Sequence, residues 1–161
     1  MNRTIIINHL IEKYGLTRYL EIGVCNPSTN FNKIRCELKH GVDNGLEYRK
    51  NPVTYRMTSD EFFQQWENGK LDLAKNFKYD IIFIDGLHTA EQIDKDIKNA
   101  LKHIKTKGFI VVHDCNPPTY EHQTEFNNGG AWNGTVWKTW IKYVNQYKAA
   151  RLDRDWETLL F

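Results

Sequence analysis

Several features that would mark a specialised class of protein are scarce or missing in this sequence. Only three of its 161 residues are cysteines, and they do not have the C-x-x-C spacing of a zinc site. No apolar run approaches the ~20 residues that span a bilayer, and the N-terminus lacks the long apolar region of a secretory signal. We therefore expect a single cytoplasmic domain, residues 1–161, with free thiols and no membrane segment.

An excess of charge of one sign is also missing. Lys and Arg total 22 against 20 Asp and Glu, so the formal net charge is +2. A near balance of this kind gives no electrostatic footprint for nucleic acid or for an anionic membrane. Hydrophobic residues make up 40% of the chain, which is typical of a globular domain. We therefore expect neither nucleic acid nor a membrane as a partner.

Glycine is scarce in the first expected strand-to-helix loop. The segment Glu21–Ser28 contains only Gly23, whereas a dinucleotide-binding loop needs three glycines so that the backbone can approach a pyrophosphate. This argues against NAD or FAD. A nucleoside without that pyrophosphate needs only a tight turn and an acid for its ribose hydroxyls. Asp43 ends the second expected strand twenty residues after Gly23, which is the spacing at which such an acid reaches a ribose.

The most informative segment that is present runs from Tyr79 to Pro117. Its apolar runs Ile81–Ile84 and Phe109–Val112 are typical of buried parallel strands, and the amphipathic helix between them has the length of a crossover. Ligands of open α/β sheets bind beyond the carboxyl ends of the strands. The polar residues at those two ends are Asp85, His88, His113 and Asp114.

Helices and strands are expected to alternate along the whole chain, which predicts an α/β fold. The expected helices cover residues 3–14, 30–38, 58–68 (opened by a Thr58–Glu61 capping box), 89–104 and 134–147. The expected strands are Tyr19–Val24, Lys39–Asp43, Val53–Met57, Ile81–Ile84, Phe109–Val112, Ala149–Leu152 and Thr158–Phe161. We predict a Rossmann-like three-layer sandwich around a mostly parallel seven-stranded sheet, with an antiparallel and abbreviated last strand.

Three chemical roles remain open for the acid and histidine cluster. Asp85 and Asp114 could hold a divalent metal, Mg or Mn, since carboxylates at neighbouring strand ends suit such ions. Alternatively, His88 or His113 could act as a metal-free general base oriented by an acid. The third alternative is structural, with each histidine bonded to backbone. Four such groups at adjacent strand ends are costly to desolvate without a role, which favours the first two.

The motifs together resemble class I S-adenosylmethionine-dependent methyltransferases that act on small molecules. The resemblance covers residues 19–138 and depends most on F-I-D-G-L-H at 83–88 and H-D at 113–114. It implies methyl transfer to an oxygen or nitrogen of a small acceptor. For the cofactor, the resemblance implies that Glu21, Gly23 and Val24 face the methionine moiety, that Asp43 binds the ribose, and that Ser59 and Asp60 lie along the adenine. It also implies that Asp85 contacts the cofactor or a metal ion. The catalytic residues that it implies are His88, His113 and Asp114.

The sequence departs from the family pattern in its first loop and after the fifth strand. Cys25 and Pro27 stand where the family often has glycines, and Cys115 replaces an Asn that completes the metal site of catechol-type enzymes. A shortened last strand would expose a sheet edge and favour a homodimer. Two rival functions therefore stay open. One is a metal-dependent hydrolase built on the Asp85, His88, His113 and Asp114 cluster, and the other is a nucleoside-binding module without catalysis.

Overall fold

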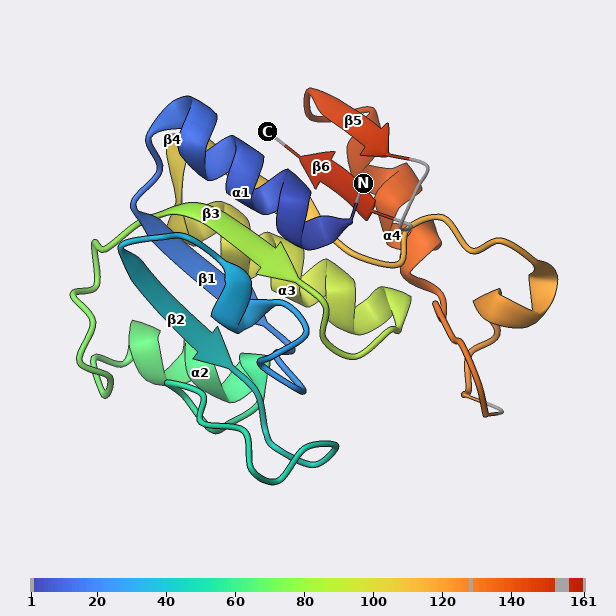
Figure 1. Cartoon of the computed structure of the whole chain (residues 1–161), viewed down its shortest axis with the longest axis horizontal. Coiled ribbons are helices and arrows are strands. Elements are labelled where there is room, and N and C mark those ends of the chain that lie inside the picture. The colour runs from blue at the N-terminus through green and yellow to red at the C-terminus, as the bar shows by residue number, and fades with distance from the viewer. Residues whose placement is uncertain (1, 128, 153–156, 161) are drawn as a thin grey trace.

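A six-stranded sheet forms the centre of the protein, in a computed structural model that describes residues 2–127, 129–152 and 157–160. The strand order is β2-β1-β3-β4-β6-β5 (Figure 1). The first four strands are parallel, and β6 runs antiparallel to both β4 and β5. The bounds are β1 Arg18–Ile22, β2 Leu38–Val42, β3 Tyr79–Ile84, β4 Ile104–Val112, β5 Ala149–Leu152 and β6 Glu157–Leu160.

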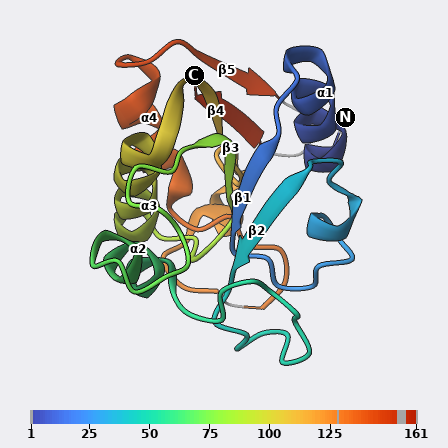
Figure 2. The ribbon, with the colours of Figure 1, turned by 90° about the vertical axis from the view of Figure 1, so that its left-hand side faces the viewer.

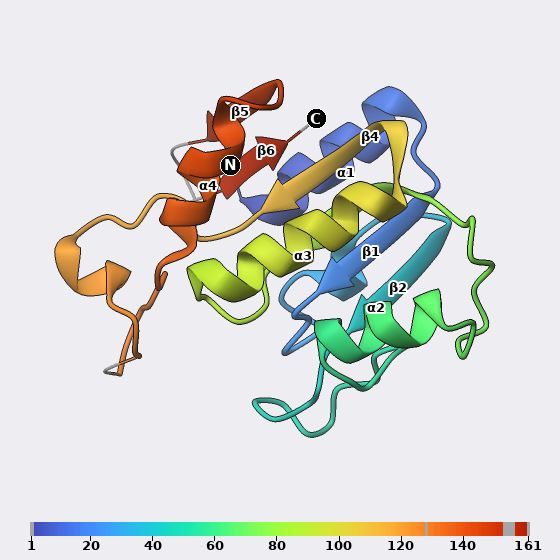
Figure 3. The same ribbon diagram turned by 180° about the vertical axis from the view of Figure 1, so that it is seen from behind.

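Helices cover both faces of the sheet. Helix α1 (Arg3–Tyr14) lies on one face, while α2 (Ser59–Glu67), α3 (Ala90–His103) and α4 (Val136–Val144) lie on the other (Figures 2 and 3). All six residues of β3 are buried, because alternate side chains enter the two cores. The predicted α/β Rossmann-like sandwich is thus confirmed. None of the helices in the described residues is both long and apolar enough to cross a membrane.

Helix α1 is fixed at both ends and along one side. The Asn2 side chain accepts a hydrogen bond from the Ile5 amide, and Gly15 ends the helix in the left-handed conformation at φ 64°. Its apolar side chains pack against the sheet in a cluster with Tyr19, Ile81, Phe83, Phe109 and Val111. Because α1 runs antiparallel to β1, its first turn lies beside the carboxyl ends of the strands (Figure 1).

The helix expected over Asn30–Leu38 is wrong. Only Phe31–Lys33 form a short 3-10 helix. The reason is Asn8 of α1, whose side chain donates to the Lys33 carbonyl at 2.9 Å and accepts from the Arg35 amide at 2.8 Å. These are backbone groups that a longer helix would have bonded internally.

The third strand of the prediction, Val53–Met57, is also wrong for the described residues. Tyr55 forms only an isolated parallel bridge with Val42. Two hydrogen bonds hold it there, from the Tyr55 amide to the Gly41 carbonyl at 2.9 Å and from the Asp43 amide to the Tyr55 carbonyl at 3.1 Å. The capping box of the following helix, between Thr58 and Glu61, is confirmed.

Gly23 is required where β1 meets the loop after β3. It has φ 83°, and a Cβ atom there would lie 2.1 Å from the Asp85 carbonyl oxygen. Gly15 has a similar φ of 64° but open space around the Cβ position.

We predict that Gly15→Ala costs about 1 kcal/mol of unfolding free energy from backbone strain alone, whereas Gly23→Ala costs roughly 3 kcal/mol or more because a collision is added. Urea denaturation measures both; equal losses would contradict the close approach.

Candidate active site at the carboxyl ends of the strands

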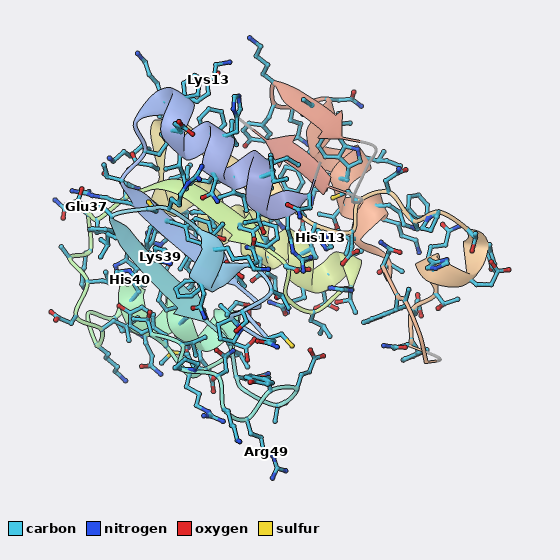
Figure 4. The ribbon with its side chains drawn as sticks, in the orientation of Figure 1. Lys13, Glu37, Lys39, His40, Arg49 and His113 are labelled. Atoms are coloured by element: carbon cyan, nitrogen blue, oxygen red, sulfur yellow. The ribbon has the colours of Figure 1, made fainter. Side chains whose placement is uncertain are left out.

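The structure brings together the four predicted residues that follow β3 and β4. Asp85 Oδ1 lies 3.2 Å from His113 Nδ1 and 3.4 Å from His88 Nε2. Asp114 Oδ2 lies 3.0 Å from His113 Nδ1 and 3.1 Å from His88 Nε2. Each carboxylate therefore contacts both imidazoles. His113 is labelled in Figure 4, beside the first turn of α1.

Asp114 is held in an unusual backbone conformation. Its φ is 60°, which is strained for a residue other than glycine. Its side chain is only 5% exposed, and its Oδ1 accepts a 2.7 Å hydrogen bond from Nδ2 of the fully buried Asn133. Both oxygens of the carboxylate thus have partners. Oδ1 contacts Asn133, at the end of the long 116–133 segment, and Oδ2 contacts the two histidines.

The segment around Asn133 is closely packed on the loop that carries His88. The Thr135 amide donates to the His88 carbonyl at 2.9 Å, and a Cβ at Gly134 would lie 1.8 Å from that oxygen. The Ala90 amide donates to Thr135 Oγ1 at 2.8 Å. These contacts hold together the two segments that reach Asp114, with His88 at Oδ2 and Asn133 at Oδ1.

His88 is surrounded by acceptors. Its Nδ1 lies 2.9 Å from the Trp132 carbonyl oxygen, and its Nε2 faces Asp85 and Asp114. A carbonyl and a carboxylate accept only, so both ring nitrogens have to donate. Burial alone would lower the pKa of His88, but the two carboxylates outweigh it and raise the pKa. The His88 ring is stacked on Trp132, with the ring centroids 5.2 Å apart.

His113 has a different environment at each nitrogen. Its Nδ1 faces the carboxylates, whereas its Nε2 lies 2.9 Å from an Nη1 of Arg3. Burial lowers the pKa of His113, and the charges of Asp85 and Asp114 overcome it and raise the pKa to about 10. The guanidinium acts in the opposite direction, because it only donates and so favours a lone pair on Nε2. The pKa of Asp85 is held below its usual range despite burial, chiefly by His113 and also by His88 and Arg3.

Arg3 is the site residue that the sequence analysis missed. Its Nη1 also lies 3.2 Å from Asp85 Oδ2, and its side chain is 27% exposed. A signal was present, since Arg3 opens a helix whose first turn contains no acidic residue. A positive charge is unfavourable at the amino end of a helix dipole. A basic residue at that position therefore indicates that an acidic side chain from another segment lies close to it.

The predicted nucleoside side of the site is formed by the tips of β1 and β2. Asp43 Oδ2 accepts from the Cys25 amide at 2.8 Å, and Oδ1 accepts from the Gly45 amide at 2.6 Å. Asp43 therefore lies directly beside the Gly23 turn, and a carboxylate keeps further lone pairs for a ligand. The Val24 side chain is 3% exposed and belongs to the core, which leaves its backbone for contact with a ligand.

Glu21 lies beneath this rim, on the face covered by α1. Its Oε2 accepts from the Tyr19 hydroxyl at 2.5 Å and from Asn30 Nδ2 at 2.9 Å. Burial raises the pKa of Glu21 to about 8, so the carboxyl is protonated at neutral pH. Asn30 in turn accepts from Thr4 Oγ1 at 2.8 Å. The chain of bonds ties the first strand to the first turn of α1.

Ser59 and Asp60 begin α2, at the same end of the sheet. Gln92 Nε2 donates to Ser59 Oγ at 3.2 Å and to Asp60 Oδ1 at 2.9 Å. Gln92 belongs to the first turn of α3, so this hydrogen bonding joins the amino ends of the two helices. Ser59 is partly buried and Asp60 is exposed.

The donor types in the cluster fit a divalent cation. One ligand atom each from Asp85, His113 and Asp114 lies within 4.8 Å of the others. Asn133 contacts Asp114 through Nδ2, and among the described residues its buried Oδ1 has no hydrogen-bond partner. Arg3 and His88, however, already lie against these carboxylates. A metal ion would have to compete with them.

Comparisons with known proteins address the family. A search among curated protein sequences finds no match. An O-methyltransferase from Bacillus cereus, solved with SAH, is 16% identical with a TM-score of 0.63, over 99% of this chain and 81% of that chain. The O-methyltransferase TomG from Streptomyces achromogenes, solved with SAM, is 13% identical with a TM-score of 0.58, over 96% and 77%. MycE from the mycinamycin pathway, solved with Mg, SAH and mycinamycin VI, is 13% identical with a TM-score of 0.59, over 97% and 48%.

At these identities the solved structures establish the fold. The sequence profile of a family described as a methyltransferase domain matches residues 9–115. That match spans more than half of the chain, and it includes Asp43 and the acid and histidine cluster. The chain belongs to this methyltransferase family, as the sequence resemblance indicated.

Proposed function

We propose that the protein transfers a methyl group from S-adenosylmethionine to an oxygen or nitrogen of a small molecule in the cytoplasm. This proposal depends on which residues lie together at the rim formed by the carboxyl ends of the parallel strands. Asp43 and the Gly23 turn lie at the tips of β1 and β2, and the acid and histidine cluster lies at the tips of β3 and β4. A donor clasped by the first pair would present its methyl group to an acceptor held by the second.

The donor site follows from the roles available to each residue. Asp43 would accept hydrogen bonds from ribose hydroxyls with the lone pairs that Cys25 and Gly45 leave free. The turn at Gly23 and Val24 would offer backbone to the methionine moiety, with Glu21 supporting it from below. Ser59 and Asp60 would lie along the adenine. Two of the structurally similar O-methyltransferases were solved in complex with SAH or SAM, which supports this assignment.

The acceptor would bind beside His113. Methyl transfer needs an acceptor lone pair in line with the sulfonium methyl, and a base removes the acceptor's proton as the new bond forms. His113 Nε2 is the candidate base, and Asp85 and Asp114 orient the ring through Nδ1. The same carboxylates raise the pKa of His113 to about 10, so the neutral form that accepts a proton becomes available as the pH rises. The acceptor hydroxyl or amine would take the place of the Arg3 nitrogen at Nε2. His88, whose two nitrogens both donate, would fix the carboxylates instead of accepting a proton.

A divalent metal would be held by Asp85, Asp114 and His113, and it would lower the pKa of a bound acceptor hydroxyl. MycE, which is similar in fold, was solved in complex with Mg. The roles given above to Asp43, His113 and His88 do not require a metal ion.

Asp43→Ala tests the donor site. We predict that the affinity for S-adenosylhomocysteine falls about tenfold to a hundredfold, because hydrogen bonds to a charged carboxylate are lost. Isothermal titration calorimetry measures it. Asn44→Ala is the matched control. Asn44 lies in the same loop, and its side chain accepts a hydrogen bond from the Leu46 amide; the affinity of this variant should equal that of the wild type. An unchanged affinity in Asp43→Ala would remove Asp43 from the site.

His113→Ala tests the base. Turnover can be followed as S-adenosylhomocysteine release with a panel of hydroxylated and amino acceptors. We expect a fall of about 10²- to 10⁴-fold, the usual contribution of general base catalysis, with S-adenosylhomocysteine binding retained. His9→Ala, an exposed histidine of α1, serves as control. Full turnover in His113→Ala would exclude His113 as the base.

A further inference from the structure

Arg3 occupies the position of a cation in the cluster. Its Nη1 lies 3.2 Å from Asp85 Oδ2 and 2.9 Å from His113 Nε2. Asp85 and His113 are also two of the three residues whose ligand atoms could hold a metal ion. The guanidinium therefore contacts the same side chains that a divalent cation would need.

The placement of Arg3 is unfavourable for α1 taken alone. The helix begins at Arg3, and its first turn contains no acidic residue. A positive charge at this end opposes the helix dipole. Asp85 supplies the missing negative charge from a strand tip across the fold, so the interaction of Arg3 is with the site and not with its own helix.

The position of Arg3 is also built into the fold. The buried residues Ile6, Ile7, Leu10 and Ile11 anchor α1 on the sheet, and the adjacent Thr4 Oγ1 donates to Asn30 Oδ1 at 2.8 Å. The Arg3 side chain nevertheless remains 27% exposed. Part of the side chain is therefore in contact with solvent, although the helix itself is anchored.

A second observation is a buried hydrogen-bond acceptor without a partner, on a residue that contacts the cluster. Asn133 is fully buried, and its Nδ2 donates to Asp114 Oδ1 at 2.7 Å. Within the described residues its Oδ1 has no hydrogen-bond partner. Amide oxygens are good ligands of Mg²⁺, Mn²⁺ and Ca²⁺, and this unused acceptor belongs to the residue that contacts Asp114.

We propose that Arg3 is a built-in competitor of a divalent cation at Asp85 and Asp114. With Arg3 in place, its guanidinium offsets the charge of Asp85 and contacts two of the side chains that a metal ion needs, so a metal ion binds weakly. When the guanidinium leaves, Asp85 Oδ2 is released and the metal site gains a full negative charge. Metal binding and the Arg3 contact therefore exclude each other. The inference concerns the cluster of the proposed enzyme, but it depends on charge and geometry and not on methyl transfer.

Arg3→Ala tests the competition through metal binding. The probe is MnCl₂, titrated into the full chain and followed by electron paramagnetic resonance of free Mn²⁺. We expect Arg3→Ala to bind Mn²⁺ at least about tenfold more tightly than the wild type, because a unit charge next to a carboxylate is removed. Arg3→Lys keeps the charge and should bind like the wild type. Lys13→Ala removes a charge at the other end of α1 (Figure 4) and should also leave the affinity unchanged.

The double variant Arg3→Ala with Asp85→Asn locates the effect, since the added affinity should disappear. Circular dichroism checks that each variant is folded. Equal Mn²⁺ affinity in Arg3→Ala and wild type, whether both bind tightly or neither binds, would overturn the proposal. So would Arg3→Lys binding as tightly as Arg3→Ala. Binding of S-adenosylhomocysteine is measured on the same samples: its absence speaks against the donor site, while the Mn²⁺ result still decides the competition.

Discussion

The charge balance between two carboxylates and their cationic neighbours is the interaction on which the candidate site depends. Asp85 and Asp114 come from adjacent strand tips and are largely withdrawn from water. Two buried carboxylates repel each other and are costly to desolvate unless each is paired. His88 and Arg3 provide that pairing, and His113 bridges both acids. The side chains of the cluster and of Arg3 are therefore held in place by one another and form one unit.

This unit is joined to the core by the first helix. The apolar side of α1 is part of the core on one face of the sheet, while its first turn reaches the site through Arg3. Directly below, a chain of hydrogen bonds runs from Thr4 through Asn30 to Glu21 and Tyr19. A segment that precedes the first strand thus controls both the cation at the cluster and the support of the first loop.

The central elements could be predicted because their sequence pattern is local and strong. Strands β3 and β4 contain continuous apolar runs, which buried parallel strands require, and α3 carries apolar residues at helical spacing. The helix expected over Asn30–Leu38 failed because Asn8, from another element, bonds the Lys33 carbonyl and the Arg35 amide. The strand expected at Val53–Met57 reduces to one bridge at Tyr55. Both errors arise from interactions between segments that no local pattern encodes.

The sequence by itself determined the α/β fold, the two strand ends at which the acid and histidine cluster lies, and the proximity of Asp43 to the Gly23 turn. These follow from periodicity and from the rule that parallel strands end at one rim. Only the tertiary structure decided that Arg3 enters the cluster across 110 residues of sequence, that Asn133 supports Asp114, and that His88 has acceptors at both nitrogens. The physical reason is that charge pairing and protonation depend on distances of about 3 Å between side chains, which packing sets and residue order does not.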